Sequence, residues 1–420
     1  MNVKSTAAAA HRALHRTVGF VRRQKRNYRI AITRAAGNNF LISLSSQYDS
    51  IYTAALGATS VDLGTINSIG GAVSSLLSPI VGWLVDRFGP KRFYVVGVAL
   101  MGLSALTYAL APTWSLIILA IILSTVALRL IGTGCGVICG DSLCNPDRAT
   151  GQNLCNALSS LASLLAPLAA AFLIAQFGGL SAEGIRPLYL IKVGGFAILT
   201  FFVALWLVDP DRGWSAQGHG LRGFLKDLGQ VIAHRPVLGR WMVVSALGWL
   251  PLAMTGPFLQ LFAHEVKGAD QYILGLMASA AVALPLAFGI PLGRLADRLG
   301  RKKVLYALSP LWWASFLLLV WAPASWVLVL AGALQGLYQI ALIIGGTMAI
   351  ELVPVAQLGR WSGLNGLFRG LVTIPGPLLG GLVWQHLGPA YVFLIPIAVD
   401  LLARLPLLST IPETLHGGQV

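Results

Sequence analysis

Twelve apolar segments, separated by short polar connections, dominate the hydropathy pattern of this 420-residue chain. A helix needs about 20 apolar residues to cross the hydrocarbon core of a bilayer. The pattern therefore predicts an all-α membrane protein with twelve transmembrane helices. We expect the spans at residues 38–58, 64–85, 92–111, 114–140, 152–176, 187–208, 238–262, 270–293, 302–322, 325–350, 360–384 and 388–409.

Composition agrees with a membrane location. Hydrophobic residues make up 56% of the chain and charged residues 11%, and the mean hydropathy is +0.74. A soluble core cannot accommodate such values, whereas a bundle of membrane helices requires them. The formal net charge of +15 does not indicate nucleic-acid binding, because most basic residues are concentrated in alternate connections and the N-terminal tail.

The basic residues also predict the orientation. The first 36 residues contain nine Lys or Arg and no acid, whereas the connections on the opposite side contain only Arg186 and Lys267. Positive connections stay cytoplasmic, so we expect both termini inside and the protein in the cell inner or plasma membrane. The tail lacks the apolar core and cleavage site of a secretory signal, although an Arg-rich, acid-poor opening also fits an organelle transit peptide.

One loop motif occurs twice. The stretch GWLVDRFGPKRF at 82–93 recurs as GRLADRLGRKKV at 293–304, each between two apolar segments. All matched positions have the same separation, which is about half of the chain. The matched pairs are Gly82 and Gly293, Asp86 and Asp297, Arg87 and Arg298, Gly89 and Gly300, and Lys91 and Lys302. Recurrence in register indicates an internal duplication into two six-span units.

This loop resembles the signature loop between the second and third helices of major facilitator superfamily transporters, repeated between the eighth and ninth. The resemblance covers nearly the whole chain and is to the prokaryotic type. It implies two pseudo-symmetric six-helix bundles with a substrate cavity between them. We therefore expect a basic cytoplasmic tail at 1–36, bundles at 37–208 and 238–411, a cytoplasmic linker at 209–237 and a cytoplasmic tail at 412–420.

A second resemblance to the family follows spans four and ten. Asp141 and Arg148 match the acidic-to-basic loop before the fifth helix, and Glu351 and Arg360 are their counterparts in the second half. Together with the ten signature-loop residues, we interpret these four as a conformational latch on the cytoplasmic side. The alternative is that the loop charges only fix the membrane topology.

The latch has a physical basis. The resemblance places Asp86 near the start of span eleven and Asp297 near the start of span five, where the helix dipole favours a carboxylate. The loop cations would meet Asp141 and Glu351. Exposed ion pairs of this kind contribute ~0–1 kcal/mol each, which suits a contact that breaks in every transport cycle.

Small residues and prolines mark spans five and eleven. Span eleven carries Gly376, Pro377, Gly380 and Gly381, which match the Gly-Pro pattern of antiporters in this family, whereas span five keeps Pro167 among alanines without those glycines. Small residues let helices approach closely, and a proline can flex a helix. We expect helix flexing at these positions.

Charges inside the spans indicate the coupling site, because an ionisable group at a helix centre costs ~2.5–3.5 kcal/mol on insertion scales and normally faces a cavity. Asp49 in span one and Arg129 in span four lie at similar depth with opposite charge. We predict Asp49 as the proton-coupling site with Arg129 as its partner. The alternative is a static pair that neutralises two buried charges.

For four further charged residues the sequence leaves open whether the role is functional or structural: Lys192, Arg369, Asp400 and Arg404. Asp400 and Arg404 are one turn apart and can neutralise each other. The uncharged candidates for the substrate cavity are Gln47, Tyr48, Tyr52, Trp249, Gln260, Gln335, Tyr338 and Gln339. Each could instead be an interhelical hydrogen-bond partner.

The sequence predicts a transporter and no enzyme, cofactor or metal site. The chain has no Gly-x-x-x-x-Gly-Lys-Ser/Thr loop for ATP, and its seven His lack ligand spacing. We expect a monomer that exports a drug-like or amphiphilic solute by alternating access, with protons as the coupling ion. Proton-coupled uptake of a small nutrient such as a sugar or organic acid is the alternative, and a membrane-embedded lipid enzyme or a non-transporting sensor would be a different class.

Overall fold

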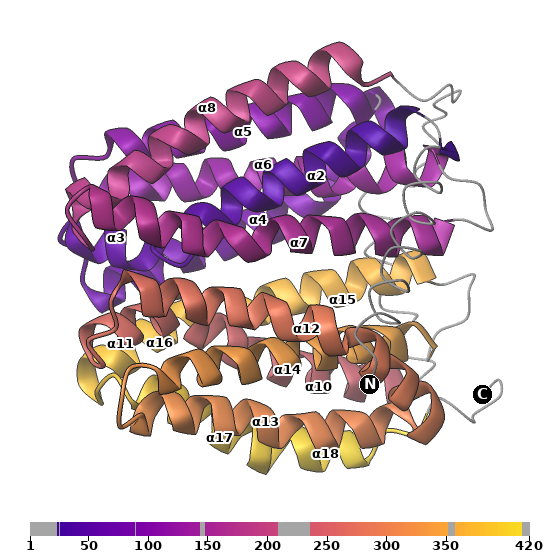
Figure 1. Cartoon of the computed structure of the whole chain (residues 1–420). Helices are drawn as coiled ribbons and strands as arrows, with labels where there is room; N and C mark the ends of the chain where they lie inside the picture. Colours follow the sequence, from indigo (N-terminus) through magenta and orange to yellow (C-terminus); the bar gives the residue numbers. More distant parts are fainter. Residues whose placement is uncertain are drawn as a thin grey trace, which may run out of the picture.

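The computed structural model describes residues 23, 24, 26–88, 90–142, 148–208, 236–351 and 358–413. Within these ranges the side chains of residues 78, 79, 82–88, 134–141, 148–150, 152, 153, 236, 349, 350, 358–364 and 367 are not described. In this part of the chain every regular element is a helix (Figure 1). Nine helical segments there are long and apolar enough to cross a membrane.

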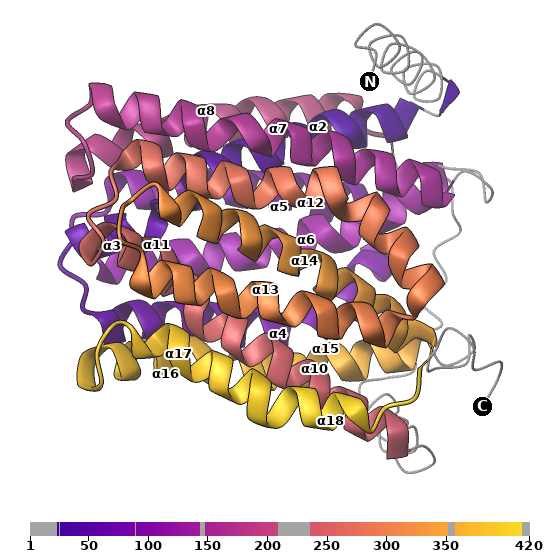
Figure 2. The same ribbon diagram turned by 60° about the horizontal axis from the view of Figure 1, so that its bottom comes forward.

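The helices form two groups in chain order. The first group is α2 (Arg26–Ser45), α3 (Asp49–Ala55), α4 (Ser60–Phe88), α5 (Pro90–Leu110), α6 (Ser115–Ser142), α7 (Arg148–Gln176) and α8 (Ala182–Trp206). The second is α10 (Pro236–Thr255), η2 (Gly256–Phe258), α11 (Leu259–Glu265), α12 (Gln271–Leu299), α13 (Arg301–Trp321), α14 (Val327–Glu351), α15 (Leu358–Thr373), α16 (Pro375–His386), α17 (Tyr391–Val399), η4 (Asp400–Arg404) and α18 (Leu405–Ser409). Consecutive short helices join end to end, so the described part of the chain makes twelve crossings, as the sequence predicts (Figure 2).

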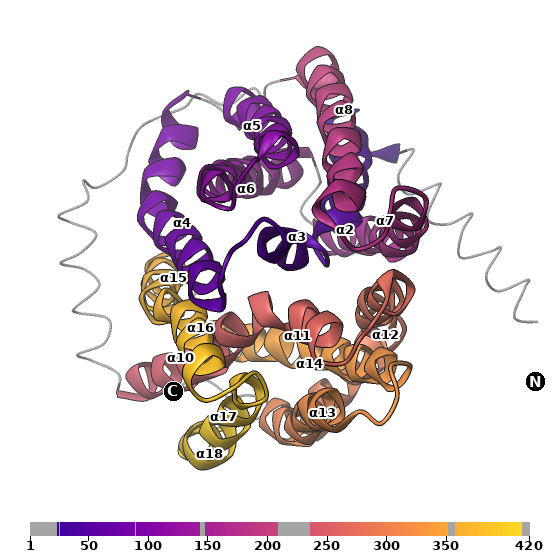
Figure 3. The same ribbon diagram turned by 90° about the vertical axis from the view of Figure 1, so that its left-hand side faces the viewer.

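The duplication is visible in the helix boundaries. Helices α4 and α12 are each 29 residues long, and α5 and α13 are each 21 residues long. The paired helices have the same separation along the chain as the two signature loops, so the second group repeats the helix order of the first. Figure 3, a view along the bundle, shows the two groups facing each other, with α4 beside α15 and α16 and α7 beside α12.

Spans one and seven are broken, which the sequence did not predict. Residues 46–48 form a turn between α2 and α3, and η2 interrupts the seventh span between α10 and α11. The break in span one places Asp49 at the first residue of α3. Discontinuous helices near the membrane centre are a common way for transporters to form binding sites.

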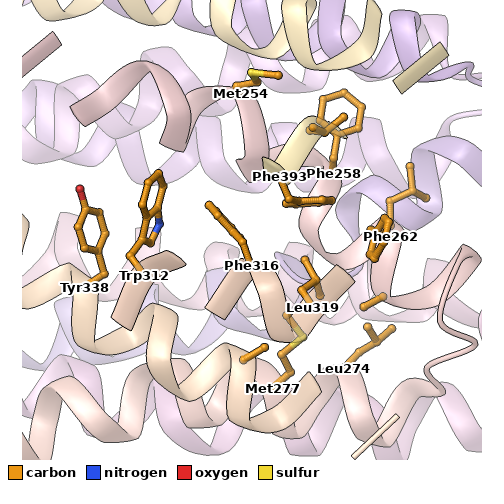
Figure 4. Packing of buried hydrophobic residues seen from close by; sticks show 14 of the residues in the cluster. Met254, Phe258, Phe262, Leu274, Met277, Trp312, Phe316, Leu319, Tyr338 and Phe393 are labelled. Atoms are coloured by element: carbon orange, nitrogen blue, oxygen red, sulfur yellow. The ribbon is translucent and has the colours of Figure 1, made fainter. Parts of the chain in front are cut away.

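The buried core is largely aromatic and aliphatic. Trp312 and Phe316 of α13, Phe393 of α17 and Phe258 and Phe262 near the start of α11 are almost fully buried and pack side by side (Figure 4). Large apolar side chains on the outer surface remain exposed, as expected for helices that face lipid. Such side chains include Ile198, Phe201, Ile290, Ile343 and Leu402.

One helix begins earlier than expected, and one expected segment is largely outside the described residues. The first helix begins at Arg26, not at residue 38, so Arg29 and Arg34 belong to a helix and not to an irregular tail. The linker between the halves, expected at 209–237, lies outside the described residues except for its last two, which begin α10.

Candidate transport site

A cavity of about 510 Å³, which we call the central cavity, lies between the two groups of helices. Its walls include both span breaks, with Asp49 following the first break and Gly256 and Pro257 in the second. Thr125 of α6 and Thr373 of α15 also line it. A site at the interface of two repeats, built on broken helices, has the location expected for a transported solute.

The carboxylate of Asp49 is held from two sides. Its Oδ1 atom accepts hydrogen bonds from the hydroxyls of Ser45 (2.9 Å) and Tyr189 (2.7 Å). Lys192 of α8 donates from Nζ to the Ser45 hydroxyl at 2.6 Å, and its charge interacts with that of Asp49. A chain of hydrogen bonds therefore runs from a buried ammonium group through Ser45 to a carboxylate at the cavity wall.

Three tyrosines pack behind Asp49. The rings of Tyr108 and Tyr189 stack with centroids 4.7 Å apart and an interplanar angle of 6°, and Tyr52 lies 4.9 Å from Tyr189. Tyr52 donates to the backbone oxygen of Tyr108 at 2.9 Å. This packing holds the Tyr189 hydroxyl against the carboxylate. The Lys192 residue beside it is buried, with an exposed fraction of 7%.

The expected pair of Asp49 with Arg129 is not formed. Arg129 donates from Nε to the hydroxyl of Ser74 on α4 at 2.8 Å, while Asp49 has Lys192 as its neighbouring cation. The side chain of Lys192 on α8 therefore lies beside Asp49, whereas that of Arg129 on α6 points to α4. Sequence reasoning left Lys192 open, and its burial within an apolar span was the available signal.

Arg369 contacts an aromatic ring. Its guanidinium carbon lies 3.3 Å from the centroid of the Trp249 ring. This contact joins α15 to α10 within the second group. The sequence left two possibilities for Arg369, the cytoplasmic surface or the cavity region, and the structure shows it against Trp249, one turn along its helix from the cavity-lining Thr373.

The eight uncharged residues expected at the substrate cavity are all described, and none lines the central cavity. Tyr48 donates across the halves to the backbone oxygen of Gln271 at 3.0 Å. Tyr338 stacks on Trp312, with centroids 4.9 Å apart, inside the second half. The other members are Gln47, Tyr52, Trp249, Gln260, Gln335 and Gln339. Tyr48 and Tyr338 thus pack between helices in this structure, and a substrate-binding role for the eight residues stays a prediction.

Asp400 and Arg404 form a buried ion pair within η4, with exposures of 1% and 7%. Trp313 donates from Nε1 to Asp400 Oδ2 at 2.8 Å, and Arg404 donates from Nη2 to the hydroxyl of Ser309 at 2.8 Å. The pair thus links the last crossing to α13. Its charges neutralise each other, as expected from their spacing.

The two copies of the expected latch differ in how much is described. Gly89 lies outside the described residues, as do the side chains of Gly82, Asp86, Arg87, Asp141, Arg148 and Arg360. In the second copy, Arg301 is paired with Glu351 at 2.6 Å and with Asp297 at 3.6 Å. Arg301 was not among the expected latch residues, whereas Glu351 and Asp297 were. The latch function stays a prediction.

The second signature loop is also tied to the last helix. Gly300 has a φ of +108°, a conformation that favours glycine. Glu413 accepts hydrogen bonds from the backbone amides of Arg301 (3.0 Å) and Lys302 (3.1 Å) at the start of α13. Lys302 Nζ in turn donates to the backbone oxygens of Ser409 and Ile411 at 2.7 Å each. These bonds fix the loop within its own half.

Glycines bring the two halves together at the end of the bundle where α4 begins and α16 ends. A Cβ atom at Gly381 would lie 2.4 Å from the backbone oxygen of Ser60, and one at Gly64 would lie 2.4 Å from that of Pro377. Of the expected flexing residues, Pro167, Pro377 and Gly381 lie at close contacts between the halves, whereas Gly376 and Gly380 pack closely against α10 and η2 of their own half. Flexing itself is not tested by these contacts.

Two six-helix halves, a cavity at their interface and broken helices beside it define a secondary transporter by architecture. The family model for the Major Facilitator Superfamily matches residues 31–286 and 242–418. The chain therefore belongs to the major facilitator superfamily, and it is a multi-pass membrane transporter, not an enzyme.

Curated relatives and solved structures resemble the chain over most of its length. The Multidrug resistance protein MdtG of Escherichia coli (strain K12 / DH10B) is 25% identical over 407 residues, covering 90% of this chain and 92% of that protein. The nucleoside transporter NupG has a TM-score of 0.72 at 16% identity, with 94% of this chain and 99% of that chain covered. A D-xylose-proton symporter has a TM-score of 0.69 at 12% identity, with 94% and 99% covered. The likeness to these two structures shows the fold alone.

Proposed function

We propose that this protein exports a drug-like or amphiphilic solute by alternating access, driven by protons that bind at Asp49. The observation that carries the proposal is the carboxylate at the cavity wall, linked through Ser45 to the buried Lys192. Burial disfavours a charged carboxylate and a nearby cation favours it. Movement of Lys192 relative to Asp49 between conformations would therefore change the affinity of Asp49 for a proton.

One comparison supports export of such solutes, because the relative with 25% identity is named for multidrug resistance. The walls of the central cavity are mixed, with Leu63, Ile121 and Leu252 beside seven hydroxyl side chains. Such walls suit a solute that has both an apolar and a polar part. Both halves of the cavity come from one chain, which is consistent with a functional monomer, and we place both termini on the cytoplasmic side.

The test is proton-driven accumulation in proteoliposomes, with a panel of labelled drugs, sugars and nucleosides. We expect Asp49→Asn to lose accumulation against a gradient and to keep downhill exchange, because the variant cannot release a proton. Glu183→Gln, at an exposed position in the first turn of α8, serves as the matched control. Accumulation by Asp49→Asn with normal pH dependence would show that the proton is carried elsewhere, and preferential uptake of a sugar or nucleoside would favour the import alternative.

A further inference from the structure

Two arginines, one on α6 and one on α15, have no acidic partner among the described residues. Within that part of the chain, Arg129 donates to the hydroxyl of Ser74, and Arg369 lies over the ring of Trp249. A hydroxyl and an aromatic face satisfy a guanidinium in part, but neither neutralises its charge. Two buried cations of the spans differ in this respect, because Lys192 has Asp49 and Arg404 has Asp400.

The two arginines belong to opposite halves, and both lie beside α4. Arg129 donates to Ser74 of α4, and Gly370, which follows Arg369, packs against the next residue of α4, Ser75. The positive charges of the two arginines therefore repel each other. Arg129 lines a second cavity of about 460 Å³, between α4 and α6, which we call the side cavity. The side cavity shares Asn67 and Thr125 with the central cavity, so the two adjoin.

Their positions along the helices agree. Arg129 is one turn beyond the cavity-lining Thr125 on α6, and Arg369 is one turn before the cavity-lining Thr373 on α15. Both lie on the side of the central cavity toward the end where α6 finishes and α15 begins, which is the predicted cytoplasmic end. Among the described residues that line the two cavities, Asp49 is the one carboxylate, and Lys192 already faces it.

We propose that Arg129 and Arg369 together bind an anionic group of the transported solute, such as a phosphonate, phosphate ester or carboxylate. The guanidinium fork suits such oxyanions, because each arginine can donate two parallel hydrogen bonds to them. The apolar part of the solute would extend from there into the central cavity. This inference rests on the proposed transport function and names the class of its substrate as organic anions.

Binding by one arginine from each half also couples the solute to the conformational change. Without an anion, mutual repulsion opposes the approach of α6 and α15 at the predicted cytoplasmic end. An anion between the two guanidinium groups replaces that repulsion with attraction to both halves. A ligand that binds the closed conformation more tightly than the open one shifts the population toward the closed conformation. The halves would therefore close at the predicted cytoplasmic end only when an anion is bound between the two arginines.

The test measures binding without any gradient. The purified protein in lipid nanodiscs is heated with phenylphosphonate, benzoate, benzyltrimethylammonium or benzyl alcohol at constant ionic strength, and its unfolding is followed by tryptophan fluorescence. We expect concentration-dependent stabilisation by the two anions and none by the cation or the alcohol. Arg129→Gln and Arg369→Gln should each weaken apparent anion affinity by about 10-fold or more, because each removes a charge-assisted contact.

Arg29→Gln is the control, because Arg29 lies on the outer surface between α2 and α8, away from the central cavity. It should leave anion affinity unchanged. Absence of stabilisation by either anion, or equal stabilisation of wild type and of both Arg→Gln variants, would overturn the inference. If anions bind as expected but Asp49→Asn still accumulates solute, proton coupling through Asp49 fails while the anion site stands, so the two proposals can fail separately.

Discussion

The contact between Gly381 and Ser60 offers a direct way to perturb the closed side of the transporter. In Gly381→Ala, the new Cβ would lie 2.4 Å from the Ser60 oxygen and 3.0 Å from the Cα of Val61, both backbone atoms. Ordinary contact starts near 3.4 Å, so α16 and α4 must separate by roughly 1 Å. Overpacking of this kind costs ~1–3 kcal/mol, which corresponds to a decrease of about 5–150-fold in the ratio of closed to open molecules.

The expected result is an opening at this end of the bundle. Pro112→Cys and Pro323→Cys, in equivalent exposed connections of the two halves, provide spin-label sites in a background with the four native cysteines replaced by alanine. Gly381→Ala should shift the distance distribution between the labels toward longer distances. Gly289→Ala on α12 is the control, because its Cβ would meet nothing within 4 Å while the gain in helix propensity is the same. Unchanged distances in Gly381→Ala would refute this role for the glycine contact.

Two further predictions concern the buried charges. Asp400→Asn should lower the free energy of unfolding by about 3–5 kcal/mol, measured with denaturant, because it leaves Arg404 buried and unpaired. Adding Arg404→Gln should recover much of this loss. A double variant that loses as much stability as the two single variants together would contradict the pairing. Lys192→Met should impair accumulation against a gradient, because it removes the ammonium group that donates to Ser45 beside Asp49. Accumulation equal to that of the wild type would exclude a role for Lys192 at the Asp49 site.

The architecture could be predicted from the sequence, because the signals for it lie in short stretches of the chain. The constant separation between the two signature loops reappears in the bounds of α4 and α12 and of α5 and α13. Small residues at Gly376 and Gly381 correctly indicated close helix contacts, because a missing side chain can be seen in the sequence itself. The breaks at 46–48 and in η2 were missed, because both lie within apolar stretches of ordinary span length.

The partners of the buried charges could not be predicted in the same way. Hydropathy gives the depth of a residue but not the rotation of its helix about its own axis. Depth suggested Arg129 as the partner of Asp49 and left the role of Lys192 open. The packing of α8 against α2 is what places Lys192 beside Asp49. The same limitation applies to Tyr338, which faces Trp312 and not the central cavity.

We propose that the movement of solute and the movement of protons are coupled through Asp49. The most direct measurement follows a pH-sensitive dye inside proteoliposomes while a solute gradient is imposed without any initial pH gradient. Proton-coupled transport predicts that downhill solute movement through the wild-type protein changes the internal pH, and that Asp49→Asn moves the solute without this change. A wild-type protein that moves solute at constant internal pH, or an Asp49→Asn variant that still moves protons with it, would contradict the claim.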